Sequence, residues 1–467
     1  MFKSLRDFLD HLEEQGDLLK VNEELSTKHE IHAVLKYADK GRGPAVFFPN
    51  VKGYRVPVVG NLLGRRRRLA WALGVEERQI VDEYYRRRQQ TRKPRIVADG
   101  PVKEVIIRDK VDITEVIPVL THHAKDIGPY FSSAVTIAKD PETGVQGMGI
   151  HRIQVKDQHT LGLFLATPPL SAYLKKAEER NQPLDIAVVI GLDPLTFFSS
   201  VIWAPPGFDK FEIAGALAQQ PIELVRCATV DLEVPAQAEF VLEGRVLPGV
   251  RDTEGPFGES SGYYFTYQNP VAEVQALMHR KDPIYQALCV WSQEESTLMD
   301  VGWAVDNLRP LRAEFPNIKR IEFREIGALG IVQIDKKSES EPQRIIEHLL
   351  STVFAKMVLV VDTDVDIDDE RELSWALATR VRGQKDLIIK PEMMGSMIDP
   401  SAVMEASTAR GKLSAIDTHV AKVTKIGVDA TKPLHELEKY EKIDIPSEIK
   451  DRIAPLIQKY CPEVKMF

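Results

Sequence analysis

Two acids separated by a Gly-Pro-Phe-Gly turn, Glu254 and Glu259, constrain this chain more than any other short segment. Glycine tolerates positive φ and proline fixes its own φ near about −65°, so we expect the residues between the acids to continue neither a strand nor a helix. Strand-like runs lie on both sides, at 239–246 and 262–267. A rigid loop between them can hold the acids in different surroundings, which separates acid and base roles. The alternative is a pair of ordinary turn residues at the surface.

A second polar feature lies upstream, in the run GMGIHRIQ at 147–154, before a strand-like segment at 161–165. An arginine with apolar neighbours on a predicted strand needs a carboxylate or phosphate partner, because its charge is not given up and is costly to bury alone. We expect Arg152 to pair with Glu254, which leaves Glu259 free for chemistry. A purely structural ion pair is the alternative, and the residues alone do not separate the two.

Together, Arg152, Glu254 and Glu259 resemble the Arg-Glu-Glu set of the UbiD-like decarboxylases, which use prenylated FMN. Further segments resemble signatures of that family, in the same order along the chain. These are GNLLG at 60–64 followed by arginines, DIGPY at 126–130, LEVPA at 232–236 with EFVLEG at 239–244, and KIGVDATK at 425–432. The resemblance therefore covers nearly the whole chain.

The pattern of predicted helices and strands changes along the chain and divides it into regions. Ser4 is a good N-cap for an amphipathic helix in an opening α/β region. From Val102 to about Cys289, short β runs punctuated by glycine and proline indicate a barrel-like β domain. Strand and helix patterns alternate from 318 to 379, as in a βαβ unit.

With the resemblance, we expect an α+β / α/β fold in five parts. They are an N-terminal α/β lobe (1–100), a split β-barrel domain that binds prenylated FMN (101–299), a helical linker (300–316), a C-terminal α/β oligomerisation domain (317–445) and a C-terminal docking helix (446–467).

Composition is ordinary for a globular enzyme of two or three domains, with 467 residues of which 43% are hydrophobic and 28% charged. The net charge of −8 gives no reason to expect nucleic acid or an anionic membrane as a partner. Arginine-rich runs at 65–68 and 86–95 fit either phosphate binding or a solvated helix face beside acids, and we favour the solvated face.

Cysteine usage and hydropathy bear on the compartment. Cys227, Cys289 and Cys461 are widely spaced with no CxxC, so a disulfide framework or a cysteine metal site is not expected. No apolar run approaches the ~18–20 residues that span a bilayer, and no basic-then-apolar leader opens the sequence. We expect a cytoplasmic protein.

The acidic run DTDVDIDD at 362–369 imitates a calcium-binding loop. An EF-hand needs glycine at its sixth position and glutamate at its twelfth, where this chain has Ile367 and Leu373. We therefore interpret the run as a strand-to-helix turn whose acids cap the following helix.

The resemblance implies roles for individual positions. Arg152 would orient the cofactor and the substrate carboxylate, for which a planar fork of donors is suited. Glu254 would fix Arg152 and balance its charge. Glu259 would protonate the carbon that CO2 leaves, with a pKa raised by burial beside an apolar substrate. The cofactor-binding positions carried over from the family are Ile150, His151, Arg152, Ala166, Pro169, Lys210 and Lys425.

Members of this family usually hold a divalent metal against the flavin phosphate with an Asn, a His and a Glu. The matching positions here are Gly147, Leu170 and Lys210, none of which can ligate a cation at neutral pH. The metal is therefore doubtful. Our hypothesis is that the Lys210 ammonium takes over the metal's charge and pairs with the phosphate, since lysine binds phosphate as a point charge. The alternative is a solvent-facing Lys210 in a degraded site.

The resemblance implies a carboxy-lyase that reversibly and non-oxidatively decarboxylates an α,β-unsaturated or (hetero)aromatic acid through a covalent prenylated-FMN adduct. The alternative, motivated by the missing metal ligands, is a non-catalytic or repurposed flavin-binding homologue. Expected partners are the small-molecule acid, CO2, a flavin prenyltransferase that supplies the cofactor and further copies of the chain in a homodimer or homohexamer. Nucleic acid and membrane are not expected.

Two further groups of polar residues remain open. Either Glu294 or Glu295 could be a third acid near the pocket, although a structural role is the favoured interpretation. His122, His123 and His151 are candidates for polar contacts and are given no catalytic role, because a lone histidine is more often a satisfied structural residue.

Overall fold

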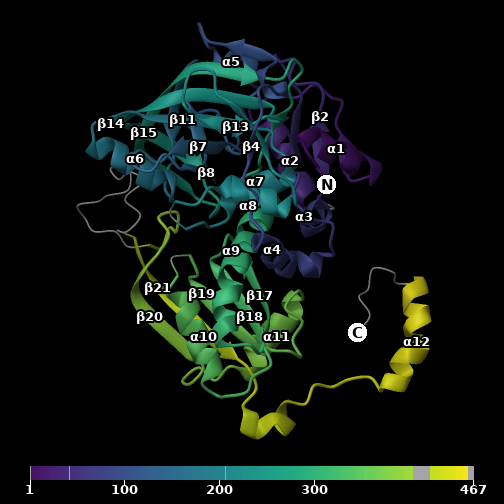
Figure 1. The fold of residues 1–467 in the computed structure, drawn as a ribbon. Coiled ribbons are helices and arrows are strands. Elements are labelled where there is room, and N and C mark those ends of the chain that lie inside the picture. The colour runs from purple at the N-terminus through teal and green to yellow at the C-terminus, as the bar shows by residue number, and fades with distance from the viewer. Residues whose placement is uncertain (1, 41–42, 206, 353, 403–420, 461–467) are drawn as a thin grey trace.

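The structure is a computed structural model that describes residues 2–40, 43–205, 207–352, 354–402 and 421–460. Figure 1 shows a large upper body that contains the N-terminal and central strands, the helix α9 running down from it, and a smaller sheet below. The last helix, α12, stands apart from both.

The N-terminal lobe packs helices around a small sheet with the strand order β1-β2-β3-β16. Ser4 caps the first helix as predicted, because its Oγ accepts a hydrogen bond of 3.2 Å from the backbone N–H of Asp7. The fourth strand comes from far along the chain and runs parallel to β3. The elements are α1 (Leu5–Glu14), β1 (Leu18–Lys20), α2 (Glu30–Lys40), β2 (Ala45–Phe48), β3 (Val58–Gly60), α3 (Arg66–Leu73), α4 (Ile80–Arg88) and β16 (Tyr285–Gln286).

The central domain is built on an open nine-stranded sheet with the order β6-β9-β10-β15-β14-β11-β7-β8, in which β5 also pairs with β15. Its strands are β5 (Val105–Ile107), β6 (Tyr130–Phe131), β7 (Val135–Lys139), β8 (Gln146–Ile150), β9 (Ile153–Val155), β10 (Thr160–Leu163), β11 (Leu184–Ile190), β14 (Phe240–Gly258) and β15 (Tyr264–His279).

Shorter elements cover the ends of this sheet. A three-stranded sheet has the order β13-β12-β4. Its strands and the accompanying helices are β4 (Arg95–Ile96), α5 (Ile113–Val116), α6 (Leu170–Glu179), α7 (Pro194–Val201), α8 (Lys210–Leu217), β12 (Glu223–Arg226) and β13 (Glu233–Pro235).

The prediction that the residues between Glu254 and Glu259 cannot continue a strand is wrong. β14 runs on to Gly258 in antiparallel pairing with β15, and the register shifts between Glu254 and Phe257. Gly255 has a φ of 101°, and a Cβ added to it would lie 2.4 Å from the carbonyl oxygen of Phe265. The strand therefore absorbs the Gly-Pro pair as a bulge, a distortion that re-aims nearby side chains.

The helix α9 (Gln293–Glu314) joins the central sheet to the C-terminal domain. That domain has a five-stranded sheet of order β17-β18-β19-β21-β20, with parallel pairing on both sides of β19. Its elements are β17 (Ile318–Arg324), β18 (Leu329–Ile334), α10 (Glu341–Leu350), β19 (Met357–Asp362), α11 (Glu370–Arg380), β20 (Leu387–Met394) and β21 (Lys422–Ala430), followed by α12 (Ser447–Tyr460).

The acidic run at 362–369 is the strand-to-helix turn that the sequence predicts. Asp369 caps α11 by accepting a hydrogen bond of 2.8 Å from the backbone N–H of Arg371. Asp364 forms an ion pair of 2.9 Å with Arg380. These acids are used to start the helix and to hold it, which confirms the interpretation as a capped turn.

The α+β / α/β architecture with a split β-barrel sheet is confirmed, while the predicted domain limits at 100, 299, 316 and 445 stay predictions. Cys227 and Cys289 are free thiols, and Cys461 and the end of the predicted docking helix lie outside the described residues. None of the helices in the described ranges is long and apolar enough to span a bilayer.

The solvated-face interpretation of the arginine runs is wrong for Arg68 and Arg87, which are 0% and 8% exposed. The Arg68 Nε donates to Asp17 Oδ2 over 2.7 Å, and its terminal nitrogens bind the carbonyl oxygens of Gly43 and Asn61. In the second run, Arg87 likewise binds backbone carbonyls. Guanidinium groups enter the core here because unpaired carbonyl oxygens converge on them.

Candidate active site

Arg152 is the centre of a buried charged cluster that borders a cavity. It lies in the two-residue gap between β8 and β9, not on a strand as predicted. Its Nε and Nη2 donate to the Oε1 and Oε2 of Glu254 over 3.1 and 2.6 Å, in the two-pronged geometry that favours arginine over lysine. Asn269 donates a third hydrogen bond of 3.0 Å to Glu254. Glu254 is 0% exposed and is therefore fully committed to holding the arginine.

Glu259 is the second acid on the same guanidinium. Its Oε1 forms an ion pair with the Nη1 of Arg152, so the expectation that Arg152 pairs with Glu254 and leaves Glu259 free is corrected. The other oxygen accepts hydrogen bonds from the N–H and Oγ of Ser260 over 3.1 and 3.4 Å. Because the strand β14 ends at Gly258, Glu259 begins the turn and reaches the cavity.

Three aromatic rings also pack close to the guanidinium of Arg152. The guanidinium carbon lies 4.1 Å from the ring centre of Phe164, 5.0 Å from that of Phe257 and 5.7 Å from that of Tyr267. Cation–π contacts of this kind hold a charged group in a site with little water. Burial, with Glu254 close by, raises the pKa of the Tyr130 phenol, so Tyr130 remains neutral.

The cavity beside Arg152 lies where the central sheet meets α9 and loops of the C-terminal domain. The sheet side carries most of the polar groups. The predicted site residues that line it are Ile150, His151, Arg152, Ala166 and Glu259. The cavity thus gathers positions that are distant in the sequence around one guanidinium and one acid.

The other predicted site residues do not line this cavity. Glu254 lies behind Arg152, and Pro169 precedes α6. Lys210 is the first residue of α8, and its Nζ donates to the carbonyl oxygen of Ser200 over 2.9 Å. Lys425 lies on β21 in the C-terminal domain, where its ammonium binds the carbonyl oxygen of Thr352. The structure does not bring Lys425 to the other predicted cofactor contacts.

Lys210 and His151 form a second buried polar pair next to the cavity. Each is only 6% exposed, so the alternative of a solvent-facing Lys210 is wrong. Burial lowers the pKa of Lys210 to about 8, against the opposing effect of Asp306. Burial and the Lys210 charge lower the pKa of His151 to about 3, and neither of its ring nitrogens has a hydrogen-bond partner among the described residues. Buried polar atoms without partners mark a place for a ligand that binds through them.

The family's metal positions do not fit a metal in this chain. A Cβ on Gly147 would lie 2.6 Å from Pro169 and 2.9 Å from Tyr173, so these two side chains fill the space of a larger residue there. Leu170 is 0% exposed in an apolar core. Across the described ranges, no group of three or more His, Cys, Asp or Glu residues could hold an ion.

Among the two acids that the sequence left open, Glu295 is the one that reaches the cavity. It accepts a hydrogen bond of 2.6 Å from Ser260 Oγ, and burial raises its pKa. Glu294 turns the other way and accepts from the backbone N–H of Leu63 over 2.9 Å. Burial raises the pKa of Glu294 to about 7. The structural role therefore belongs to Glu294.

Sequence reasoning missed the contribution of the C-terminal domain. Ile326, Phe354 and Ile398 all line the cavity from loops of that domain. They carry no charge and belong to no recognised motif, so no signal in the local sequence distinguishes them from core residues.

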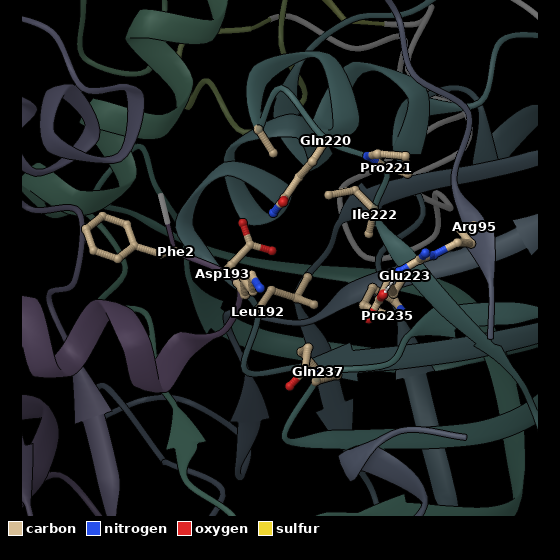
Figure 2. Close-up of a pocket in the computed structure, with 13 residues that line it drawn as sticks. Phe2, Arg95, Leu192, Asp193, Gln220, Pro221, Ile222, Glu223, Pro235 and Gln237 are labelled. Atoms are coloured by element: carbon tan, nitrogen blue, oxygen red, sulfur yellow. Dashed lines mark hydrogen bonds and ion pairs between the residues drawn. The ribbon is translucent and has the colours of Figure 1, made fainter. Parts of the chain in front are cut away.

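A second cavity, shown in Figure 2, lies away from these residues, beside Phe2 and the segment 220–223. Three of its charged side chains have structural partners: Asp193 Oδ1 caps α7 through the N–H groups of Leu195 and Thr196, and Arg95 pairs with Glu223. It contains none of the predicted site residues.

Comparisons with known proteins agree over almost the entire chain. The sequence matches the profiles of the 3-octaprenyl-4-hydroxybenzoate carboxy-lyase N-terminal domain over residues 9–88, of its Rift-related domain over 95–293 and of its C-terminal domain over 296–430. An anhydromevalonate phosphate decarboxylase of Methanothermobacter thermautotrophicus is 32% identical, over 94% of this chain and 99% of its own length.

Solved structures give the same result. The UbiD-class enzyme HmfF of Pelotomaculum thermopropionicum, in complex with FMN, superimposes with a TM-score of 0.88 and 38% identity, over 97% of this chain and 99% of its own. The closed form of the vanillic acid decarboxylase of Sedimentibacter hydroxybenzoicus gives 0.84 and 30%, over 98% and 99%. With an Arg-Glu-Glu cluster beside its central cavity, this chain belongs to the UbiD family of carboxy-lyases.

Proposed function

We propose that the chain reversibly decarboxylates an α,β-unsaturated or (hetero)aromatic carboxylic acid with prenylated FMN as cofactor. The main support for this proposal is the difference between the two acids that bind Arg152. Glu254 and Glu259 both form ion pairs with it, but only Glu259 also lines the cavity. HmfF structures with FMN and with prenylated FMN support the choice of cofactor.

The residues around the cavity have separate tasks in this reaction. Arg152 binds the substrate carboxylate, and Glu254 keeps the guanidinium in place. When bound, prenylated FMN supplies the covalent activation that allows CO2 to leave. Glu259 then delivers a proton from its carboxyl oxygen to the vacated carbon, and the same residue removes that proton in the carboxylation direction.

The cofactor would lie against the sheet side of the cavity. Ile150, His151, Arg152 and Ala166 would contact it. Pro169 stays a sequence prediction, since it packs beside Gly147 and does not line the cavity. The ring nitrogens of His151 have no hydrogen-bond partner in the described part of the chain, and the ammonium of Lys210 is buried. Both fit a group that brings hydrogen-bonding atoms and negative charge. Lys425 stays a sequence prediction, and its place on β21 gives it no support.

We propose in addition that Lys210 replaces a metal as the partner of the flavin phosphate. The filled space at Gly147 supports this substitution, and so does Lys210, which is buried and has the Ser200 carbonyl as its one hydrogen-bond partner among the described residues. Elemental analysis of purified holoprotein tests it, because stoichiometric manganese at this site is incompatible with a lysine anchor.

The decisive experiment for the function is co-expression with a flavin prenyltransferase, followed by a screen of aromatic, heteroaromatic and acrylic acids for CO2 exchange. We expect a coloured protein with a flavin spectrum that exchanges CO2 with at least one acid. A coloured protein that exchanges CO2 with none of them would instead favour a repurposed flavin-binding homologue, the alternative suggested by the altered metal positions.

We also propose a cytoplasmic homodimer or homohexamer. The helix α12 stands apart from the rest of the chain, with Leu456 54% and Tyr460 70% exposed, as expected for a helix that docks on another subunit. Size-exclusion chromatography with light scattering measures the state directly, and a monomer at micromolar concentration contradicts it.

A further inference from the structure

The turn between β17 and β18 has an unusual backbone. Glu325, Ile326 and Gly327 have φ values of 51°, 59° and 81°. Glycine adopts positive φ freely, but a β-branched residue such as isoleucine rarely does, and such conformations gather at functional sites. The position of Ile326 therefore needs an explanation beyond connecting two strands.

The helix α9 holds this turn in place. The backbone N–H of Gly327 donates to Asp300 Oδ1 over 2.8 Å. A Cβ on Gly327 would lie 2.7 Å from Trp303 Cδ1, so the turn rests directly on the indole ring. The same ring lies 4.3 Å, centre to centre, from that of Phe354. One tryptophan thus supports both the turn and a second residue that lines the active-site cavity.

Ile326 does not adopt this conformation to join the hydrophobic core. It is only half-buried, and it belongs to none of the core clusters among the described residues. Instead its side chain lines the cavity that contains Arg152 and Glu259, and also a neighbouring cavity. The turn therefore places an apolar side chain between two hollow spaces.

Four residues line both cavities: Ser260 from the central domain, and Ile326, Phe354 and Ile398 from the C-terminal domain. The three apolar side chains are called the wall. Beyond the wall, the neighbouring cavity contains Lys356, which is paired with Asp399 over 2.7 Å. On the near side, the charged groups come from the central domain and α9, and the C-terminal domain adds only apolar side chains. An acid whose carboxylate binds Arg152 would extend along apolar surface toward this wall.

We propose that the wall of Ile326, Phe354 and Ile398 sets the maximum length of the substrate and selects an acid whose far end is apolar. The inference rests on the proposed function and specifies its substrate class. Ile326 is a specificity-determining residue in this scheme, and the α9 residues Asp300 and Trp303 position it. A hydrophobic wall discriminates by size, and a charged group pressed against it would lose its hydration.

The test compares ligands that differ only beyond the first ring. Unreactive 3-phenylpropanoic acid and its longer 4-biphenyl analogue are titrated by calorimetry against flavin-loaded wild type and Ile326→Ala. We expect the biphenyl acid to bind the variant at least ~10-fold more tightly than wild type, and the phenyl acid to change by less than ~3-fold. A phenyl acid with a second carboxylate in the para position should bind wild type at least ~10-fold more weakly than the parent.

The control is Val423→Ala, which removes an apolar side chain that lines only the neighbouring cavity. The proposal would be overturned if Val423→Ala increased the affinity for the biphenyl acid as much as Ile326→Ala does. It would also be overturned if neither variant increased that affinity. Equal binding of the mono- and dicarboxylate would overturn the requirement for an apolar end. Ile326→Phe provides the opposite change and should weaken the phenyl acid.

Turnover separates this inference from the proposed function. Cinnamic and 4-phenylcinnamic acids are compared for CO2 release in the same variants. If wild type decarboxylates neither these nor any other acid, the proposed function fails, while the binding data still report on the wall. If wild type is active and Ile326→Ala keeps the same length limit, only the inference fails.

Discussion

Arg68 and Arg152 are both buried and paired with acids, yet their surroundings differ. Arg68 binds one carboxylate, from Asp17, and the carbonyl oxygens of Gly43 and Asn61. The side chain of Arg152 binds two carboxylates and, among the described residues, no backbone carbonyl. One of the two acids, Glu259, lines a cavity. The first guanidinium is enclosed by fixed partners, while the second is shared between a fixed partner and one that can react.

The difference shows that burial of a charge does not by itself mark a functional site. At Arg68, the single carboxylate of Asp17 is shared with a second cation, Arg67, and the other partners are dipoles that cannot ionise, so no acid there needs a proton. At Arg152, one cation meets two carboxylates, and the cluster carries excess negative charge unless one acid holds a proton. A buried cluster with this imbalance beside a cavity is suited to moving a proton.

The largest effect is expected from removal of the enclosed arginine. Arg68→Met removes the buried partner of Asp17, leaves only the half-exposed Arg67, and should lower the free energy of unfolding by about 3–5 kcal/mol. Urea unfolding measures the loss. Arg67→Met is the control, because Arg67 binds the same acid from a position that is 47% exposed and should cost under ~1 kcal/mol. Equal losses in the two variants would show that Arg68 is not a structural centre.

At the other arginine, the change should be in rate. Glu259→Gln should retain flavin and fold normally but lose at least ~10²-fold in turnover, as when a general acid is removed. CO2 release with any accepted acid measures it. Glu294→Gln is the matched control, since Glu294 is also a buried acid but binds the N–H of Leu63. A near-normal rate for Glu259→Gln would show that Glu259 is not the general acid.

Lys210 extends the comparison to a third buried cation. Lys210→Met should weaken FMN binding by at least ~10-fold, because a hydrogen bond to a charged group is worth ~1.5–3 kcal/mol. Wild-type affinity should fall as pH rises through about 8, where the ammonium loses its proton. Fluorescence titration of FMN measures both effects. Lys176→Met, on the surface of α6, should change neither, and unchanged affinity in Lys210→Met would make this lysine structural like Arg68.

The smallest effect concerns acid stability at Asp17. Burial alone would raise the pKa of this carboxyl, but hydrogen bonds from Arg68 and Arg67 lower it below the ordinary 3.8. A carboxyl whose pKa is lower in the folded protein than in the unfolded chain stabilises the fold at pH values above its ordinary pKa. This stabilisation is lost as the pH falls through the lowered pKa. The gap in unfolding free energy between wild type and Asp17→Asn should therefore narrow below pH 3.8. A gap that is constant with pH would mean that the ion pair adds nothing.

The sequence was sufficient to name the three residues of the charged cluster, but not to predict the backbone and the cavity around them. Arg152, Glu254 and Glu259 could be named because the residue types and flanking segments resemble a family signature. The bulge at Gly255 and Pro256 was misread as the end of a strand, because long-range pairing with β15 overrides local turn preference. The burial of Arg68 depends on carbonyls that converge only in the folded chain.

The wall residues of the C-terminal domain are a clearer case of what the sequence alone does not predict. Ile326 and Phe354 are recognisable only from what they border, since an apolar residue in a turn has no chemical signature of its own. Specificity here comes from the meeting of two domains, which neither local propensity nor a motif reports.

The late arrival of β16 has a consequence for biosynthesis. During translation, the edge of β3 emerges early but its parallel neighbour, Tyr285–Gln286, is made only after more than half of the chain. The N-terminal lobe therefore waits on the ribosome with an open sheet edge, a state in which chains are prone to aggregate. An isolated fragment that ends near residue 100 lacks that neighbour, and chaperones that cover exposed strands should matter for producing this protein.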